Sequence, residues 1–113
     1  AEKLNQKYNA KGAFFEPEVK DSYFNMAEKV KDHMYLIDVA KTAFEKEGIT
    51  PIVSPIRGGT DGASLSYKGL PCPNLSTGGD NFHGIYEYLN LNAFHKMIAV
   101  LIQITQEMIG KKA

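Results

Sequence analysis

Residues 55–88 read PIRGGTDGASLSYKGLPCPNLSTGGDNFHGIYEY, and they bring several glycines, one arginine and one histidine into a single segment. A glycine turn at Arg57 to Gly62 opens the stretch, and a second turn at Gly78-Gly79 leads into His83-Gly84. The apolar run Leu70 to Leu75 lies between the turns and has the character of a short buried strand. Glycine-rich loops at the ends of a strand place polar side chains at the edge of a sheet, where sites are common. The segment therefore predicts a site carried by two loops.

The sequence on both sides of this segment carries helical patterns. From about residue 31 to 47, apolar side chains recur at the spacing of an amphipathic helix, and Gly48 follows as a stop. The same spacing recurs from about 92 to 109, with Gly110 after it. Shorter helices are predicted at residues 1–8, closed by Asn9 and then Gly12, and at residues 63–68, ended by Gly69.

Two further segments resemble strands that contain proline. Residues 13–20 and 49–56 are rich in aromatic or β-branched residues, but Pro17, Pro51 and Pro55 cannot donate to a ladder. We expect edge or bulged strands there and a domain boundary near Pro55. Strands that alternate with helices predict an α/β or mixed α+β fold.

Composition restricts the class of protein. The chain has 113 residues, 13 basic and 13 acidic side chains, and one cysteine, Cys72. Balanced charge makes nucleic acid or an anionic membrane surface a poor partner, and one cysteine cannot form an internal disulfide. The longest apolar run, residues 97–102, is too short to span a bilayer, and residues 1–20 lack the apolar core of a signal peptide. We expect a soluble, cytoplasmic protein.

The histidines differ in their surroundings. His33 and His95 each lie near the predicted start of a helix, where solvated or packing roles are the usual ones. His83 precedes Gly84 in a glycine-bracketed loop and is the better candidate for a metal ligand. From spacing alone, a lone histidine in a loop still favours a structural role over a ligand.

Arg57 enters the first glycine turn. Its guanidinium fork could bind a carboxylate or phosphate, aided by the backbone amides of Gly58, Gly59 and Thr60, or it could be an ordinary surface arginine. Asp61 is better explained as the start of the next helix than as a catalytic acid. The glycine pattern matches neither a P-loop nor a dinucleotide fingerprint, so a nucleotide site is not expected. Cys72 lies between two prolines and is expected to be a buried structural thiol.

Taken in order, these motifs resemble a known family. The run 56–63, IRGGTDGA, followed by 69–75, GLPCPNL, then Thr77-Gly78-Gly79 and Asn81-Phe82-His83-Gly84, looks like the C-terminal part of the peptidase T family. That family comprises tripeptide aminopeptidases among the two-zinc exopeptidases related to carboxypeptidase G and succinyl-diaminopimelate desuccinylase. The likeness extends through residues 23–26, YFNM, and the terminal helix, and so covers nearly the whole chain.

The resemblance implies an α/β zinc-exopeptidase catalytic domain with an inserted α+β lid or dimerisation domain. Residues 1–55 would be the end of the lid domain, and residues 56–113 the C-terminal part of the catalytic domain. His83 matches the last zinc ligand, while Arg57, Gly58, Gly59 and Thr60 match a loop that lines the substrate pocket. The implied activity is removal of the N-terminal residue from a tripeptide by water activated at two zinc ions.

The remaining ligands and the general base of that family match nothing in this chain, so no catalytic residue is assigned here. We expect the isolated chain to be inactive and to bind zinc weakly, because each zinc needs about three protein ligands. Two other functions stay open. One is a non-catalytic interaction module, or homodimer, formed through residues 1–55, and the other is a small anion-binding protein using residues 57–62.

Overall fold

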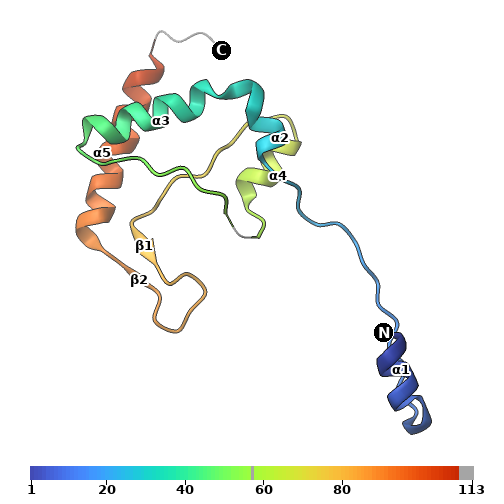
Figure 1. Ribbon diagram of the computed structural model, residues 1–113. Coiled ribbons are helices and arrows are strands. Elements are labelled where there is room, and N and C mark those ends of the chain that lie inside the picture. Colours follow the sequence, from blue (N-terminus) through green and yellow to red (C-terminus); the bar gives the residue numbers. More distant parts are fainter. Residues whose placement is uncertain (57, 110–113) are drawn as a thin grey trace.

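A computed structural model describes residues 1–56 and 58–109 (Figure 1). The described part is mainly helical, with one small antiparallel sheet, and so combines helices and strands as a mixed α+β class does. Its elements in chain order are α1 (Glu2–Tyr8), η1 (Asn9–Lys11), α2 (Ala27–Val30), η2 (Lys31–His33), α3 (Tyr35–Lys46), α4 (Asp61–Tyr67), β1 (Gly79–Asp80), β2 (Tyr88–Leu89) and α5 (Leu91–Met108), where η1 and η2 are short 3₁₀ turns.

The predicted helices are confirmed, and local signals explain their ends. Asn90 begins α5, because its Oδ1 accepts the backbone N–H of Ala93 at 3.1 Å. Gly12 and Gly48 follow η1 and α3 in left-handed conformations, with φ of 77° and 70°. Gly110 lies outside the described residues.

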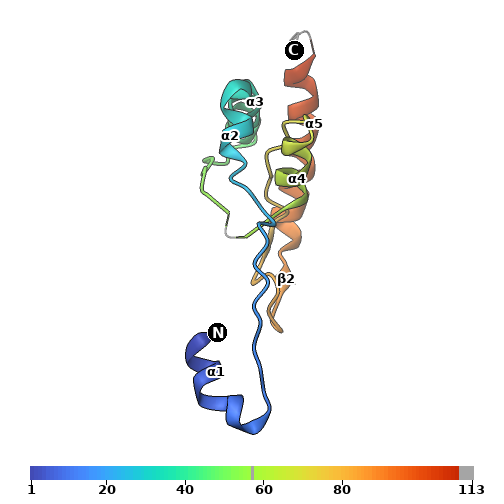
Figure 2. The same ribbon diagram turned by 90° about the vertical axis from the view of Figure 1, so that its right-hand side faces the viewer.

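The core of the structure is the contact between α3 and α5, which cross each other in Figure 1 and lie next to each other in Figure 2. Ala43 of α3 meets Met97 and Val100 of α5, and all three are buried. At the ends of this contact, Lys46 pairs with Glu107, and Lys96 Nζ donates to the Glu47 carbonyl at 3.1 Å. The core is thus built from residues on both sides of position 55, while the predicted domain boundary stays a prediction.

Three segments predicted as strands are not strands among the described residues. Residues 13–20, 49–56 and 70–75 belong to no ladder there, although Pro-containing runs of this kind were expected at sheet edges. The prediction that 70–75 is buried is also wrong, because Leu70 is 58% and Leu75 38% exposed. An apolar run forms a strand only when a neighbouring strand accepts its hydrogen bonds, and no such neighbour lies beside these segments in the described part of the chain.

The molecule is unusually open for its size. Its radius of gyration is 20.5 Å, against about 13 Å for a compact domain of this length. The exposed area is 9310 Å², against about 6200 Å² for a compact monomer of the same mass. Helix α1 stands apart at the end of an extended segment and is tied back to it by two hydrogen bonds between Asn5 and the backbone of Phe15 (Figure 1).

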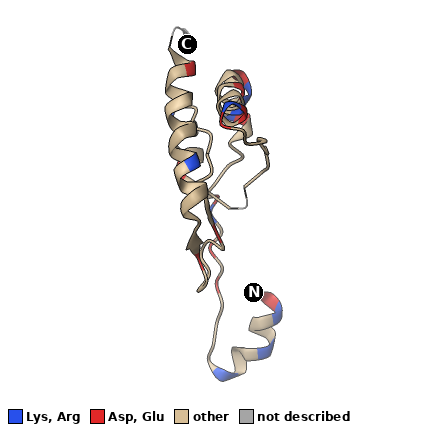
Figure 3. Cartoon of the chain, turned by 90° about the vertical axis from the view of Figure 1, so that its left-hand side faces the viewer, with Lys and Arg blue, Asp and Glu red and all other residues tan. Residues whose placement is uncertain are grey.

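Helix α5 is largely apolar, although several of its side chains are exposed to solvent. Apart from His95, its only acidic or basic side chains are Lys96 and Glu107. Most of the helix accordingly has the tan colour of the other residues in Figure 3. Its far side presents apolar side chains to solvent, with Ile98, Leu101 and Ile102 between 43% and 52% exposed. Apolar residues on several faces are typical of a helix enclosed within a larger structure. No helix in the described ranges is long and apolar enough to cross a membrane.

Candidate functional site

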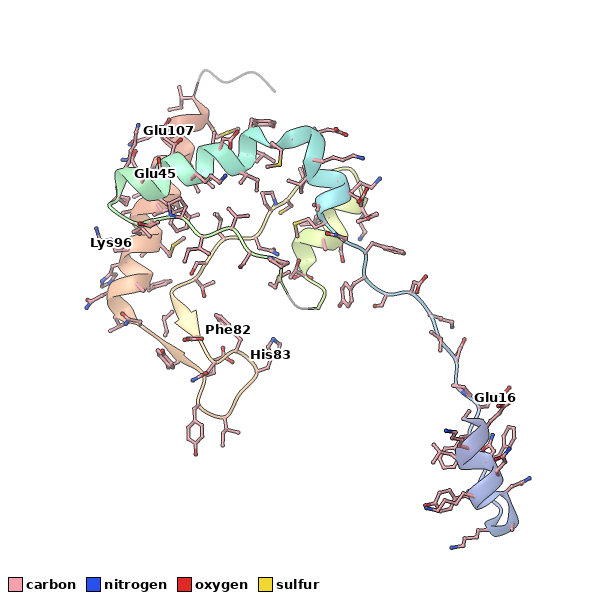
Figure 4. All side chains as sticks on the ribbon, in the orientation of Figure 1. Glu16, Glu45, Phe82, His83, Lys96 and Glu107 are labelled. Atoms are coloured by element: carbon pink, nitrogen blue, oxygen red, sulfur yellow. The ribbon has the colours of Figure 1, made fainter. Side chains whose placement is uncertain are left out.

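His83 lies in a loop that connects the two strands of the sheet (Figure 4). The strands pair antiparallel, with Gly79 opposite Leu89 and Asp80 opposite Tyr88. Within the loop, Gly84 N–H donates to the Asn81 carbonyl at 3.0 Å, and Glu87 N–H donates to the Gly84 carbonyl at 3.1 Å. This hairpin could not be predicted from the sequence, because strands of two residues carry no readable periodicity.

The backbone at His83 adopts an uncommon conformation. His83 has a φ of 65°, and Asn81 has a φ of 55°, both in the left-handed region where residues other than glycine are rare. The side chain of Glu87 supports it, since its Oε2 accepts the backbone N–H of His83 at 3.1 Å. The carboxylate therefore closes the loop on itself and leaves the imidazole exposed, with no hydrogen-bond partner among the described residues.

The zinc implied by the resemblance can be tested against this geometry. Across residues 1–56 and 58–109, no three His, Cys, Asp or Glu side chains are grouped so that they could hold a metal ion. The Glu87 carboxylate accepts a hydrogen bond from the backbone N–H of His83, and no hydrogen bond joins it to the imidazole ring among the described residues. The described residues do not by themselves fit a zinc site, although an exposed imidazole is free to contribute one ligand to a site completed by other residues.

The glycine loop, defined here as residues 58–60, is fixed where it enters α4. Thr60 Oγ1 accepts the backbone N–H of Ala63 at 3.1 Å and so caps the helix. The same oxygen accepts from Asn74 Nδ2 at 3.1 Å. Helix α4 therefore begins at Asp61, as predicted, and Thr60 is its N-cap. Arg57 lies outside the described residues, and its role stays a prediction.

A second set of contacts ties α4 to the proline-flanked run. Ser66 Oγ donates to the Gly62 carbonyl at 2.7 Å and accepts the N–H of Cys72 at 2.9 Å. A methyl group at Gly62 would lie 2.5 Å from the Cys72 carbonyl oxygen, so the two segments pack backbone to backbone. Cys72 is only partly buried, whereas a buried thiol was expected from its setting. Its place in these contacts is nevertheless structural.

The structure does not join the two predicted halves of the site. No hydrogen bond, ion pair or ring contact links His83 to residues 58–60 within the described part. A pocket of about 300 Å³ lies between α3 and residues 50–54 and 73–76, and neither His83 nor the glycine loop lines it. His33 is in η2, just before α3, and His95 is exposed in the first turns of α5, so both lie near the start of a helix as predicted.

Comparison with known proteins identifies a family to which this chain is similar. No protein-family model matches the chain. It is 53% identical over 88 residues to peptidase T of Alkaliphilus oremlandii, which covers 78% of this chain and 22% of that protein. It is 50% identical over 111 residues to peptidase T of Caldanaerobacter subterraneus subsp. tengcongensis, and this alignment covers 98% of this chain and 26% of that protein. For peptidase T of Fusobacterium nucleatum, the identity is 48% over 105 residues, and this alignment covers 93% of this chain and 25% of that protein.

The chain therefore spans about a quarter of the length of the curated relatives it matches. Identity near one half over most of this chain is too high and too continuous to come from a shared short motif, and the three relatives named above are all peptidases T. On this similarity, the chain belongs to the peptidase T family.

Proposed function

We propose that this chain is part of a zinc-dependent aminopeptidase that releases the N-terminal residue from tripeptides. The observation that carries the proposal is His83, an exposed imidazole held in a left-handed turn by a carboxylate, in a chain about half identical to several peptidases T. Conformations this costly persist mainly where a surrounding structure or a function requires them. The metal, the tripeptide substrate and the N-terminal cleavage belong to this proposal.

The residues of this chain have binding and positioning roles in it. His83 would offer one ring nitrogen to a zinc ion whose other ligands come from outside this chain. The bound metal would supply the activated water that attacks the peptide bond. The amides of Gly58, Gly59 and Thr60, together with Arg57, would bind negative charge on the substrate.

The experiment compares two proteins. One is the isolated chain, and the other is a full-length chimera in which this chain replaces the 105 residues that it matches in peptidase T of Fusobacterium nucleatum. We expect the chimera to release the N-terminal residue of a tripeptide, to lose that activity with a zinc chelator and to regain it with added zinc. The isolated chain should release none above background. Failure of the chimera, when the unmodified relative is active, would contradict the proposal.

Glu87 offers a sharper test of the loop. Glu87→Ala removes the acceptor for the His83 backbone N–H, so we expect zinc affinity of the chimera to fall about tenfold, as is usual when a group supporting a ligand is lost. Glu87→Gln keeps an acceptor oxygen and should stay within about twofold of the parent. Zinc affinity is measured by competition with a chromogenic chelator. Equal affinities for the Ala and Gln variants would show that this hydrogen bond does not support the loop.

A non-catalytic interaction module remains the second candidate. The exposed aromatic side chains before α2 favour it, since Phe14 is 70% and Tyr23 60% exposed. Self-association of the isolated chain through residues 1–55 would predict a concentration-dependent sedimentation coefficient that truncation of residues 1–25 abolishes. Hydrolysis by the chimera separates this function from the first.

A further inference from the structure

Residues 23–26 lie along α4 and contact its C-terminal residue, Tyr67. The rings of Phe24 and Tyr67 are 5.2 Å apart, and the Tyr67 hydroxyl donates to the Asn25 carbonyl at 3.1 Å. Lys29 Nζ lies over the same Tyr67 ring, 5.1 Å from its centroid. Aromatic and cation–π contacts of this kind hold a segment at a defined place on a helix.

The same segment reaches the loop at the other end of α4. The ring of Tyr23 lies directly on Gly59, because a methyl group built there would be only 1.9 Å from Cδ1 and 2.0 Å from Cγ. Gly59 is not among the glycines with positive φ, so its backbone does not itself require glycine. The absence of a side chain at Gly59 is what admits the ring.

A third contact lies between these two. The Met26 methyl carbon is 3.5 Å from the position that a Cβ would occupy at Gly62, in the first turn of α4. The four residues 23–26 therefore touch the helix near its start and at its end, and also the loop before it. Since Thr60 joins the glycine loop directly to α4, fixing Gly59 and α4 together leaves the loop little freedom.

We propose that Tyr23 is a positioning residue for the glycine loop. The proposal rests on the function proposed above, in which this loop contacts the peptide substrate. Tyr23 acts through Gly59, and its aromatic ring is the part that matters, because its hydroxyl makes no hydrogen bond within the described residues. Through residues 23–26, the chain that precedes α2 sets the position of a loop some 35 positions further along.

The first test is a pair of substitutions in the full-length chimera. Tyr23→Ala frees the loop, so we expect KM for the tripeptide to rise about tenfold while kcat stays within about twofold, the pattern of a lost binding interaction. Zinc content should not change, because Tyr23 is no ligand. Tyr23→Phe keeps the ring and should keep the parent KM. A fall in kcat together with zinc loss, or an unchanged KM in Tyr23→Ala, would overturn the positioning role.

The second test asks whether Tyr23 works through Gly59. Gly59→Ala places a methyl group inside the Tyr23 ring and should raise KM at least as much as Tyr23→Ala. In the double variant the methyl group meets no ring, so KM should be no higher than in Tyr23→Ala alone. Effects that simply multiply would mean that the two positions are independent and would overturn the proposal. Thermal unfolding of the four proteins gives the same coupling without any use of activity.

These outcomes separate the two proposals. If the unsubstituted chimera hydrolyses no peptide, the proposed function fails and the positioning role fails with it. If the chimera is active but Tyr23→Ala has the parent KM, only the positioning role fails.

Discussion

His83→Ala in the full-length chimera is expected to lose zinc and peptide hydrolysis together, each by about 100-fold or more. The reason is that a ligand bonded to the metal contributes more than the groups around it, whose removal alone costs about 10- to 100-fold. The Glu87 carboxylate binds the backbone of residue 83, so the hairpin should keep its shape when the imidazole is removed. Zinc per protein, measured by mass spectrometry of the purified variant, and the rate of tripeptide hydrolysis are the two readouts.

His95→Ala is the matched control for this experiment. His95 is also an exposed histidine, but it projects from α5 and is outside the hairpin. The control should retain zinc and activity within about twofold of the parent, as is usual for surface substitutions away from a site. His83→Ala with full zinc content and full rate would remove His83 from the metal site, whatever the activity of the parent protein.

Gly78→Ala is expected to give the largest loss of stability in the hairpin, about 3 kcal/mol in the free energy of unfolding. Gly78 has a φ of 82°, which costs a residue with a Cβ about 1–2 kcal/mol. The new methyl group would also lie 2.6 Å from the backbone nitrogen of Phe94 and 2.8 Å from the carbonyl carbon of Ala93. Both are backbone atoms of α5 and cannot move away by a change of rotamer. Overpacking therefore adds about 1–3 kcal/mol to the loss in the free energy of unfolding.

Gly69→Ala separates the two costs. Gly69 has a φ of 97°, but a methyl group there would meet no atom within 4 Å. Its substitution should therefore cost only the backbone term, about 1–2 kcal/mol. Urea unfolding of both variants of the chimera, followed by circular dichroism, measures the difference. Equal losses for the two variants would mean that the contact between Gly78 and α5 does not hold in solution.

The sequence predicts the helices of this chain better than its strands, and the reason is physical. Helices α3 and α5 satisfy their backbone hydrogen bonds internally, so the apolar spacing along each one is enough to define it. Residues 49–56 have the composition of a strand, but a strand forms only by hydrogen bonding to a neighbouring strand. No strand pairs with these residues in the described part of the chain. The fold class was predictable, whereas the pairing was not.

The candidate site divides in the same way. His83 could be singled out from the glycines around it and from the family resemblance. The left-handed backbone of His83 and the hydrogen bond from its N–H to Glu87 depend on how the loop closes. In the sequence, only the four-residue spacing between His83 and Glu87 was compatible with that contact. Tyr23 belongs to the run 23–26 that resembles the family, but nothing in the sequence indicated its contact with Gly59. The two residues are far apart in sequence and meet only because residues 23–26 run along α4.

The apolar faces of helix α5 also determine how many substitutions this helix can tolerate. One face of it packs on α3 through Met97 and Val100, and the opposite face is apolar as well. If both faces have neighbours in the complete protein, few positions along this helix can accept a polar side chain. A mutational scan of the full-length chimera should then find α5 restricted on nearly every turn, in contrast to α1, whose polar surface stands apart from the rest of the chain.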